Sequence, residues 1–483
     1  MRYISTRGGR GVTPASAVLK GMADDGGLYV PEEFPAFDWE ACLNKTPLAI
    51  SEAILCAFLP DCGAEPGLVD KAYFHKFSSP QLCPLVKVGD LWSLELYHGP
   101  TSAFKDVALS VLPRLISAAR KSSGIETIHI LTATSGDTGK AALEGFHDVP
   151  GTEITVFFPE DGVSAVQKAQ MTTQEGGNVH VFGVKGNFDD CQRGVKKAFA
   201  ELADALPKGA ALSSANSINI GRLIPQIAYY FMAYASLCRR SVIRVGESVD
   251  FAVPTGNFGD ILAGYYAKKL GLPVGKLLCA SNANNVLTDF LASGIYDSRR
   301  PFHVTTSPSM DILVSSNLER LLFDVLDGDS ETLRACMDAL NTEGVYQLDA
   351  PVMERIRESF AGYACGDERA AAIIRTLWER ERYLCDPHTA VGFAAAEDYR
   401  AERGCEHPLV VLSTASPFKF PEAVLSALGV KAKSDGFRQM QQLSAYTGLS
   451  IPEKLRTLSG KKVLHKTVIE ADEITAYVRR NVK

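Results

Sequence analysis

From about residue 125 the chain alternates short β-rich runs with segments of helical spacing, and this alternation restricts the possible folds more than any other feature. The β-rich runs are TIHILTA (127–133), EITVFFP (153–159), VHVFGV (179–184), VDFAVP (249–254), KLLCAS (276–281) and PLVVLS (408–413). Such alternation predicts an α/β fold in which parallel sheets carry helices on both faces. Ligands of such folds bind at the carboxyl ends of the strands, so the site is expected in the loops that follow these runs.

Composition and charge narrow the class of protein. The 483 residues suffice for two or three domains, and the 46% hydrophobic and 22% charged residues are ordinary for a soluble globular enzyme. A formal net charge of −6 provides no basic field, so neither nucleic acid nor an anionic membrane is expected as a partner. The eleven cysteines are scattered without a CxxC pair, which favours reduced thiols over a disulfide framework or a zinc site.

Two segments indicate where in the cell the protein is expected. The apolar stretch 223–238 is interrupted by Pro225 and Gln226 and is too short to cross a bilayer, so it is predicted to be a buried helix. The start, MRYISTRGGRG, lacks the apolar core of a secretory signal. We therefore expect a cytoplasmic protein.

The stretch LYHGPTSAFKDVA (96–108) places Lys105 behind a Gly-Pro-Thr turn and before an apolar segment. Burial at such a position would disfavour the charged ammonium and lower the pKa of the lysine. Taken alone, this lysine is more simply interpreted as a side chain that extends to water, since structural charges outnumber functional ones.

Two glycine-containing loops follow β-rich runs. TATSGDTGKAA (132–142) joins a predicted strand to a predicted helix and would favour an anion at the helix N-terminus, although a simple capping turn explains it as well. It is not a P-loop, because Thr134 replaces the first glycine and Ala141 follows Lys140. In PTGNFGD (254–260), Gly256 and Gly259 would let backbone N–H groups converge on phosphate oxygens, or would simply form a turn.

Two further loops carry polar groups. SSANSINIGR (213–222) offers amide and hydroxyl donors and the planar guanidinium of Arg222, which suits phosphate, although a polar helix cap is the simpler interpretation. LSTASPFKFPEA (412–423) follows the last β-rich run, and there Lys419 could attract an anion, although serine and threonine at this point are usual turn residues.

Together, these loops and Lys105 indicate pyridoxal phosphate. That cofactor needs an amine for covalent attachment, a cup for its phosphate and a partner for its ring nitrogen. A nucleophilic hydrolase is disfavoured because no GxSxG motif occurs, and the histidines form no HExxH pair.

Six ordered motifs then identify a family resemblance. LYHGPTSAFKD, LTATSGDTG, SSANSINIGR, PTGNFGD, DPHTAVGFAA and LSTASPFKF resemble the threonine synthase family, in the longer form of fungi and many bacteria. The resemblance covers nearly the whole chain and is weakest over about 295–380 and after 430. It implies a fold-type-II pyridoxal phosphate enzyme with two parallel-sheet α/β domains and a mainly helical N-terminal domain. The implied division is an N-terminal domain (1–86), a large cofactor-binding domain (87–120 and 209–430, with a helical insertion at about 315–385), a nested small domain (121–208) and a C-terminal extension (431–483).

The resemblance also implies roles for individual residues. Lys105 matches the lysine that carries the cofactor, Thr414 matches the hydroxyl that faces the pyridine nitrogen, and Asp137 stands beside the ring hydroxyl. The phosphate-binding loop corresponds to Gly256, Asn257, Phe258 and Asp260. Residues similar to substrate contacts of the family are Thr134, Ser135, Thr138, Asn216, Ser217 and Arg222. One departure is visible, because Ser416 and Phe418 stand where close relatives often carry His and Ala.

The function implied by the resemblance is the conversion of O-phospho-L-homoserine and water to L-threonine and phosphate, by a monomer or homodimer. Two alternatives stay open. One is a pyridoxal-phosphate-dependent phospho-lyase that releases 2-ketobutyrate, and the other is a non-catalytic protein that only binds the cofactor.

Overall fold

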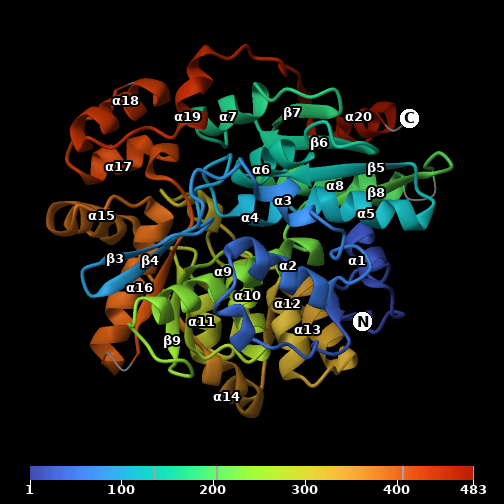
Figure 1. Cartoon of the computed structure of the whole chain (residues 1–483). Coiled ribbons are helices and arrows are strands. Elements are labelled where there is room, and N and C mark those ends of the chain that lie inside the picture. The colour runs from blue at the N-terminus through green and yellow to red at the C-terminus, as the bar shows by residue number, and fades with distance from the viewer. Residues whose placement is uncertain (135, 203–204, 405–406, 434, 482–483) are drawn as a thin grey trace.

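Two sheets of mainly parallel strands organise the chain (Figure 1). The computed structural model describes residues 1–134, 136–202, 205–404, 407–433 and 435–481. The larger sheet has the strand order β13 (Phe360–Ala364), β10 (Val274–Ser281), β9 (Val249–Pro254), β14 (Leu409–Ser413), β4 (Leu91–Glu95) and β3 (Leu85–Val88). All neighbours in it are parallel except β3 and β4. The predicted α/β fold class is therefore confirmed.

The smaller sheet is wholly parallel. Its strand order is β15 (Val468–Glu470), β7 (Val179–Lys185), β6 (Thr152–Pro159), β5 (Thr127–Ala133) and β8 (Ala210–Ser214). Strand β8 begins two residues beyond position 208, where the nested small domain is predicted to end, and β15 comes from the predicted C-terminal extension. The smaller sheet is thus assembled from segments that are distant in sequence.

All six β-rich runs form strands, namely β5, β6, β7, β9, β10 and β14. They are recognisable because both faces are covered by helices, which selects continuous apolar side chains. The strands that sequence patterning missed are shorter or lie at or near sheet edges. One of them, β13, lies inside the predicted helical insertion at about 315–385, so that segment also supplies the edge strand of the larger sheet.

The larger sheet is covered on its two faces by different helices. Helix α9 (Ile220–Arg239) is buried along almost its whole length and packs against α10 (Gly259–Lys269), as expected for the apolar stretch 223–238. Helix α16 (Pro387–Arg403) packs against β9, β10 and β14. These contacts hold the carboxyl ends of β9 and β14 in place.

The remaining helices surround these layers. They are α1 (Pro14–Lys20), α2 (Pro47–Phe58), α3 (Leu68–Tyr73), α4 (Lys105–Leu109), α5 (Leu112–Ser123), α6 (Asp137–Phe146), α7 (Ala165–Thr172), α8 (Phe188–Leu202), α11 (Val286–Ser293), α12 (Leu318–Val325), α13 (Ser330–Thr342), α14 (Ala350–Ser359), α15 (Asp367–Glu381), α17 (Pro421–Ala427), α18 (Gly436–Thr447), α19 (Glu453–Arg456) and α20 (Ile474–Asn481).

The two ends of the chain join different layers. Near the N-terminus, α1 to α3 accompany a short antiparallel pair, β1 (Tyr3–Ser5) and β2 (Tyr29–Pro31), and α2 packs on α9. Another such pair joins β11 (Ile295–Asp297), which precedes the predicted insertion, to β12 (Val345–Gln347), which lies inside it. The red C-terminal segment in Figure 1 crosses to the smaller sheet, where β15 pairs with β7 and α20 packs on α8.

Two expectations from composition can be compared with the described residues. Every cysteine described by the structure is free, and most are buried, as expected for reduced thiols. Within the described part of the chain, no helix combines the length and apolar character needed to span a bilayer.

Candidate active site

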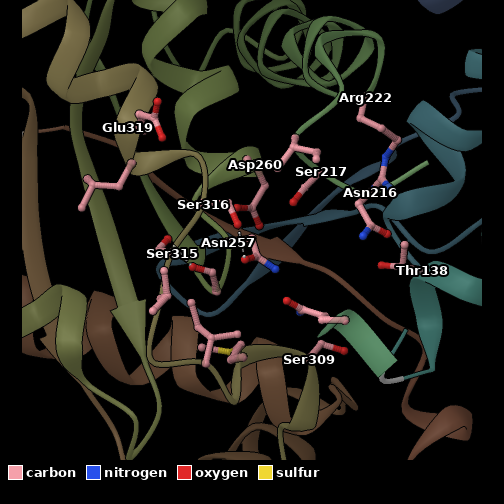
Figure 2. Close-up of a pocket in the computed structure, with 18 of the residues that line it drawn as sticks. Thr138, Asn216, Ser217, Arg222, Asn257, Asp260, Ser309, Ser315, Ser316 and Glu319 are labelled. Carbon is pink, nitrogen blue, oxygen red and sulfur yellow. Dashed lines mark hydrogen bonds between the residues drawn. The ribbon is translucent and has the colours of Figure 1, made fainter. Parts of the chain in front are cut away.

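A cavity of about 330 Å³ opens where loops at the carboxyl ends of the two sheets meet (Figure 2). Most of the sequence-predicted site residues line it: Lys105, Thr134, Thr138, Asn216, Ser217, Arg222, Gly256, Asn257, Asp260 and Thr414. In Figure 2, Thr138, Asn216 and Arg222 lie on one side of the cavity, and Asn257, Ser315 and Ser316 lie on the other. Ser135 lies outside the described residues.

Lys105 begins helix α4, and hydrogen bonds on both sides fix the loop before it. Thr101 donates its N–H and its hydroxyl to the carboxylate of Asp106, over 2.8 and 2.6 Å. The N–H of Phe104 donates to the carbonyl of Thr414 over 2.8 Å. This loop therefore joins Lys105 to the end of β14, and Ser102 adopts a positive φ of 60° within it.

The protein environment of Lys105 favours the neutral form of its amine over the charged form, compared with the same amine in water. Burial lowers the pKa of Lys105 to about 8, because an ammonium loses hydration there. The carboxylates of Asp137 and Asp260 oppose this shift, whereas the cations of Arg222 and Lys419 reinforce it. The predicted low pKa of this lysine thus agrees with the environment that the fold creates.

The glycine loop after β9 is anchored through its carbonyl groups. The Ser315 hydroxyl donates to the carbonyl of Gly256 over 2.8 Å, and Asn317 donates both its N–H and its side-chain amide to the carbonyl of Asn257, over 3.1 and 2.9 Å. Phe258 takes a positive φ of 61° immediately before α10. The first N–H groups of α10 have no intrahelical acceptor, so this turn presents an anion-binding helix N-terminus beside the cavity.

Two of the predicted residues lie near the cavity without lining it. Phe258 is fully buried and its ring packs 5.4 Å from that of Phe360, so its contribution to the loop is its backbone conformation. Asp137 begins α6, and its Oδ1 lies 2.7 Å from Nζ of Lys419 and accepts from the Gln167 amide over 2.9 Å. These partners hold the pKa of Asp137 well below its usual range despite burial, so it is a carboxylate.

Asp260 has the opposite behaviour. Burial raises the pKa of its carboxyl to about 7, although the N–H of Ile261 donates to Oδ1 over 2.9 Å and Lys105 favours ionisation. Asp260 therefore titrates near neutral pH, close to the N-terminus of α10.

Unsatisfied polar atoms mark another part of the cavity. The guanidinium of Arg222 donates from Nη1 to the carbonyl of Ala215 over 2.6 Å, and its Nε is buried with no hydrogen-bond partner among the described residues. The buried Oδ1 of Asn216 also has no hydrogen-bond partner among the described residues. Burial lowers the pKa of Arg222 to about 10, which still leaves it cationic at neutral pH. Such atoms are suited to a polar ligand that supplies the missing bonds.

Thr134 and Thr414 line the cavity, and each directly follows the carboxyl end of a strand, β5 and β14 respectively. The hydroxyl oxygen of Thr134 accepts from the N–H groups of Gly136 and Gly139, over 2.9 and 2.8 Å, and so shapes the start of α6. Thr414 directly follows β14, and its N–H donates to the Thr389 hydroxyl over 3.2 Å.

Sequence patterning missed several lining residues. His388 belongs to the quoted motif DPHTAVGFAA, but no role was predicted for it. Its Nε2 accepts from the N–H of Ser309 over 3.1 Å and its Nδ1 donates to Asp386 over 2.7 Å, so the ring is held as the neutral Nδ1–H tautomer. Arg7, near the N-terminus, and Glu319, on α12, also line the cavity, and no local pattern connects these two residues.

Within the described residues, no cluster of histidine, cysteine, aspartate and glutamate side chains could hold a metal ion. The cavity instead offers an amine, an anion-binding helix terminus, a buried guanidinium and several hydroxyl groups.

Comparisons with known proteins agree with this inventory. Residues 77–415 match the family of pyridoxal-phosphate dependent enzymes, residues 2–62 match the threonine synthase N terminus, and residues 389–473 match the threonine synthase C-terminal region. Threonine synthase of Pseudomonas aeruginosa is 42% identical over 440 residues, which cover 88% of this chain and 90% of the relative.

Two solved structures superpose over the whole chain. The pyridoxal-phosphate-bound threonine synthase of Brucella melitensis has a TM-score of 0.87 and 39% identity, with 100% of each chain covered. Yeast threonine synthase has a TM-score of 0.88 and 32% identity, with 100% of this chain and 98% of that one covered. By sequence, fold and the contents of its cavity, the chain belongs to the threonine synthase family of pyridoxal-phosphate dependent enzymes.

Proposed function

We propose that this protein converts O-phospho-L-homoserine and water into L-threonine and phosphate. The observation that carries the proposal is that one cavity holds the amine of Lys105, whose pKa is lowered, together with two sites suited to anions. One anion site is the guanidinium of Arg222, and the other is the set of backbone N–H groups at the start of α10. A phosphorylated amino acid and a phosphorylated cofactor each need such a site. Membership of the threonine synthase family supports the same substrate class.

The residues present fit pyridoxal phosphate. Lys105 supplies the amine for attachment, the loop from Gly256 to Asp260 supplies the phosphate cup, and Thr414 supplies a hydroxyl for the ring nitrogen. A Cβ added at Gly256 would lie 3.0 Å from the carbonyl oxygen of Ser309, so the loop leaves space for backbone only. When bound, the cofactor supplies the conjugated ring that accepts electrons from the substrate carbon atoms.

Lys105 is proposed to move protons at the substrate carbon atoms. A lysine with a pKa of about 8 has an appreciable neutral fraction near neutral pH, and only the neutral amine can accept a proton. Because the loop before Lys105 is tied to Asp106 and to the end of β14, the amine acts from a defined place in the cavity.

Arg222 and Asn216 are proposed to hold the substrate phosphate. The guanidinium has a free Nε–H for a phosphate oxygen, and it stabilises the dianion that leaves from the substrate. Ser217 and Thr138 line the same part of the cavity and can donate hydroxyl hydrogen bonds. Thr138 and Asn216, from segments beside the smaller sheet, lie on the opposite side of the cavity from Asn257 (Figure 2).

The test is a product assay with O-phospho-L-homoserine. Purified holoenzyme is expected to release phosphate and L-threonine in equal amounts, with little 2-ketobutyrate. If 2-ketobutyrate is the main product, the protein is a phospho-lyase and the proposal is wrong. If no phosphate is released, the protein only binds the cofactor. The Lys105→Met variant serves as the background control.

A further inference from the structure

Lys419 lies at the end of a short helical turn, Pro417–Lys419, that follows β14, and its side chain is fully buried. Its Nζ lies 2.7 Å from Oδ1 of Asp137, which is itself only 4% exposed. It also donates to the carbonyl of Thr101 over 3.0 Å. Removing both charges of such a pair from water costs free energy, so the pair calls for a reason beyond stability.

The two partners of Lys419 belong to segments that are distant in sequence. Asp137 begins α6 beside the smaller sheet, whereas Thr101 belongs to the loop that leads to Lys105. Thr101 in turn donates its N–H and its hydroxyl to Asp106, the residue that follows Lys105. A single ammonium therefore connects the carboxylate of the small-sheet loop with the loop that orients the reactive amine.

Helix α7 strengthens the same junction. Gln167 donates to Oδ1 of Asp137 over 2.9 Å, and Gln170 donates to the carbonyl of Thr101 over 3.3 Å. The two side-chain amides therefore donate to the same two groups that Lys419 contacts, the carboxylate of Asp137 and the carbonyl of Thr101. Since an amide carries no charge, Lys419 is the residue of this junction that neutralises Asp137.

Charged groups from four elements act on Lys105. Asp137 of α6 and Asp260 of α10 stabilise its ammonium, and Arg222 of α9 and Lys419 of the Pro417–Lys419 turn destabilise it. Asp137 and Lys419 form one ion pair, so their effects on Lys105 oppose each other. Loss of either member would leave the other uncompensated inside the protein.

We propose that Lys419 is a positioning residue for Lys105, which holds Asp137 in place as a carboxylate and offsets its field at the reactive amine. The proposal rests on the proposed function of Lys105. It predicts that the protonation of Lys105 depends on the charge of Lys419, and that neutralising both Lys419 and Asp137 is milder than neutralising either one.

The experiment measures the free amine of Lys105 directly. Full-length apoprotein is labelled with a trace of acetic anhydride between pH 6 and 10, and acetylation of the peptide containing Lys105 is followed by mass spectrometry. The variants are Lys419→Met, Asp137→Asn and the double variant. The matched control is Lys268→Met, which removes a half-buried lysine that donates to the carbonyl of Gly275 and does not line the cavity.

Lys419→Met removes a repelling charge, so its labelling midpoint is expected about one pH unit above that of the parent, which slows labelling at pH 7 about tenfold. Asp137→Asn removes an attracting charge and is expected to shift the midpoint in the opposite direction. The double variant is expected between the two single variants, and Lys268→Met is expected to match the parent.

Equal midpoints for Lys419→Met and the parent would overturn the proposal. If Lys419→Met does not fold, as judged by circular dichroism, an unshifted midpoint in Asp137→Asn would overturn it equally, because that variant keeps the side-chain volume. The labelling needs no substrate, so a failed product assay would refute the proposed function while leaving this result to stand separately.

Discussion

Arg7 and Glu319 form a bidentate ion pair, with Nε 3.0 Å from Oε1 and Nη2 2.9 Å from Oε2. Thr6 donates its hydroxyl to the same Oε1 over 2.6 Å. The pair connects the segment after β1 with α12 across 312 residues of sequence, at the edge of the cavity. The hydrogen bond to Glu319 raises the pKa of Arg7, so Arg7 keeps its positive charge at neutral pH.

Replacing Glu319 with glutamine is expected to lower the free energy of unfolding by about 2 kcal/mol, because a partly buried guanidinium loses its counter-ion. Urea denaturation of the apoprotein measures this change. The control is Glu343→Gln at an exposed position, which is expected to have little effect. Equal losses in the two variants would show that the Arg7–Glu319 pair does not stabilise the fold.

Replacing Lys105 with methionine is expected to abolish the absorption band of the lysine-bound cofactor and the formation of L-threonine, because no amine remains for attachment. Absorption spectra recorded after loading with pyridoxal phosphate and dialysis against buffer without cofactor test this directly. Spectra like those of the parent would refute the assignment of Lys105.

The same variant has a predicted effect on stability. The pKa of Lys105 falls to about 8 in the folded protein, below its value in the unfolded chain, so the native lysine destabilises the apoprotein at pH 7. Lys105→Met is expected to raise the free energy of unfolding by about 2 kcal/mol at pH 7. That gain should decline as the pH rises from about 8 towards about 10.5, and a gain independent of pH would contradict the assigned cause.

Two glycines of the phosphate loop provide a matched pair of substitutions. A Cβ at Gly256 would lie 3.0 Å from the backbone oxygen of Ser309, whereas a Cβ at Gly259 would lie 3.5 Å from the side-chain amide of Asn317, an ordinary contact. Gly256→Ala is therefore expected to weaken pyridoxal phosphate binding about tenfold, and Gly259→Ala to change it much less. Titration of the apoproteins by fluorescence measures both, and equal affinities would contradict this account of the loop.

Asp260 predicts a pH dependence of stability. Its folded-state pKa of about 7 exceeds that of an unfolded aspartate, so the group contributes stability below about pH 4 that is lost as the pH rises towards about 7. Asp260→Asn cannot ionise, and its amide oxygen can still accept from the N–H of Ile261. The apoprotein of this variant is expected to gain about 2 kcal/mol over the parent as the pH rises through that window, as measured by denaturation at several pH values. A constant difference would show that Asp260 does not titrate there.

Arg222 separates phosphate recognition from cofactor binding. Arg222→Lys keeps the charge but loses the planar set of donors, so it is expected to lower kcat/KM for O-phospho-L-homoserine about tenfold or more while leaving the cofactor spectrum unchanged. Inhibition by inorganic phosphate should weaken in parallel. A changed spectrum with unaltered kinetics would place Arg222 at the cofactor instead of the substrate.

The sequence predicted those parts of the site that depend on short stretches of neighbouring residues. The loops holding Gly256 and Thr414 follow long apolar runs, and such runs predict strands whose carboxyl ends bind ligands. Strand β13 escaped prediction because it is a short edge strand that directly follows α14. Strand β15 escaped because it has only three residues, of which both outer ones are exposed.

By itself, then, the sequence determined the α/β class, the six main strands and the loops in which chemistry was expected, because strand and loop preferences depend on neighbouring residues. Only the tertiary structure decided that Lys419 pairs with Asp137 and that Arg7 pairs with Glu319. Contacts between residues hundreds of positions apart depend on how the two sheets and their helices pack. The residues next to Lys419 in the sequence do not indicate which carboxylate will pair with it.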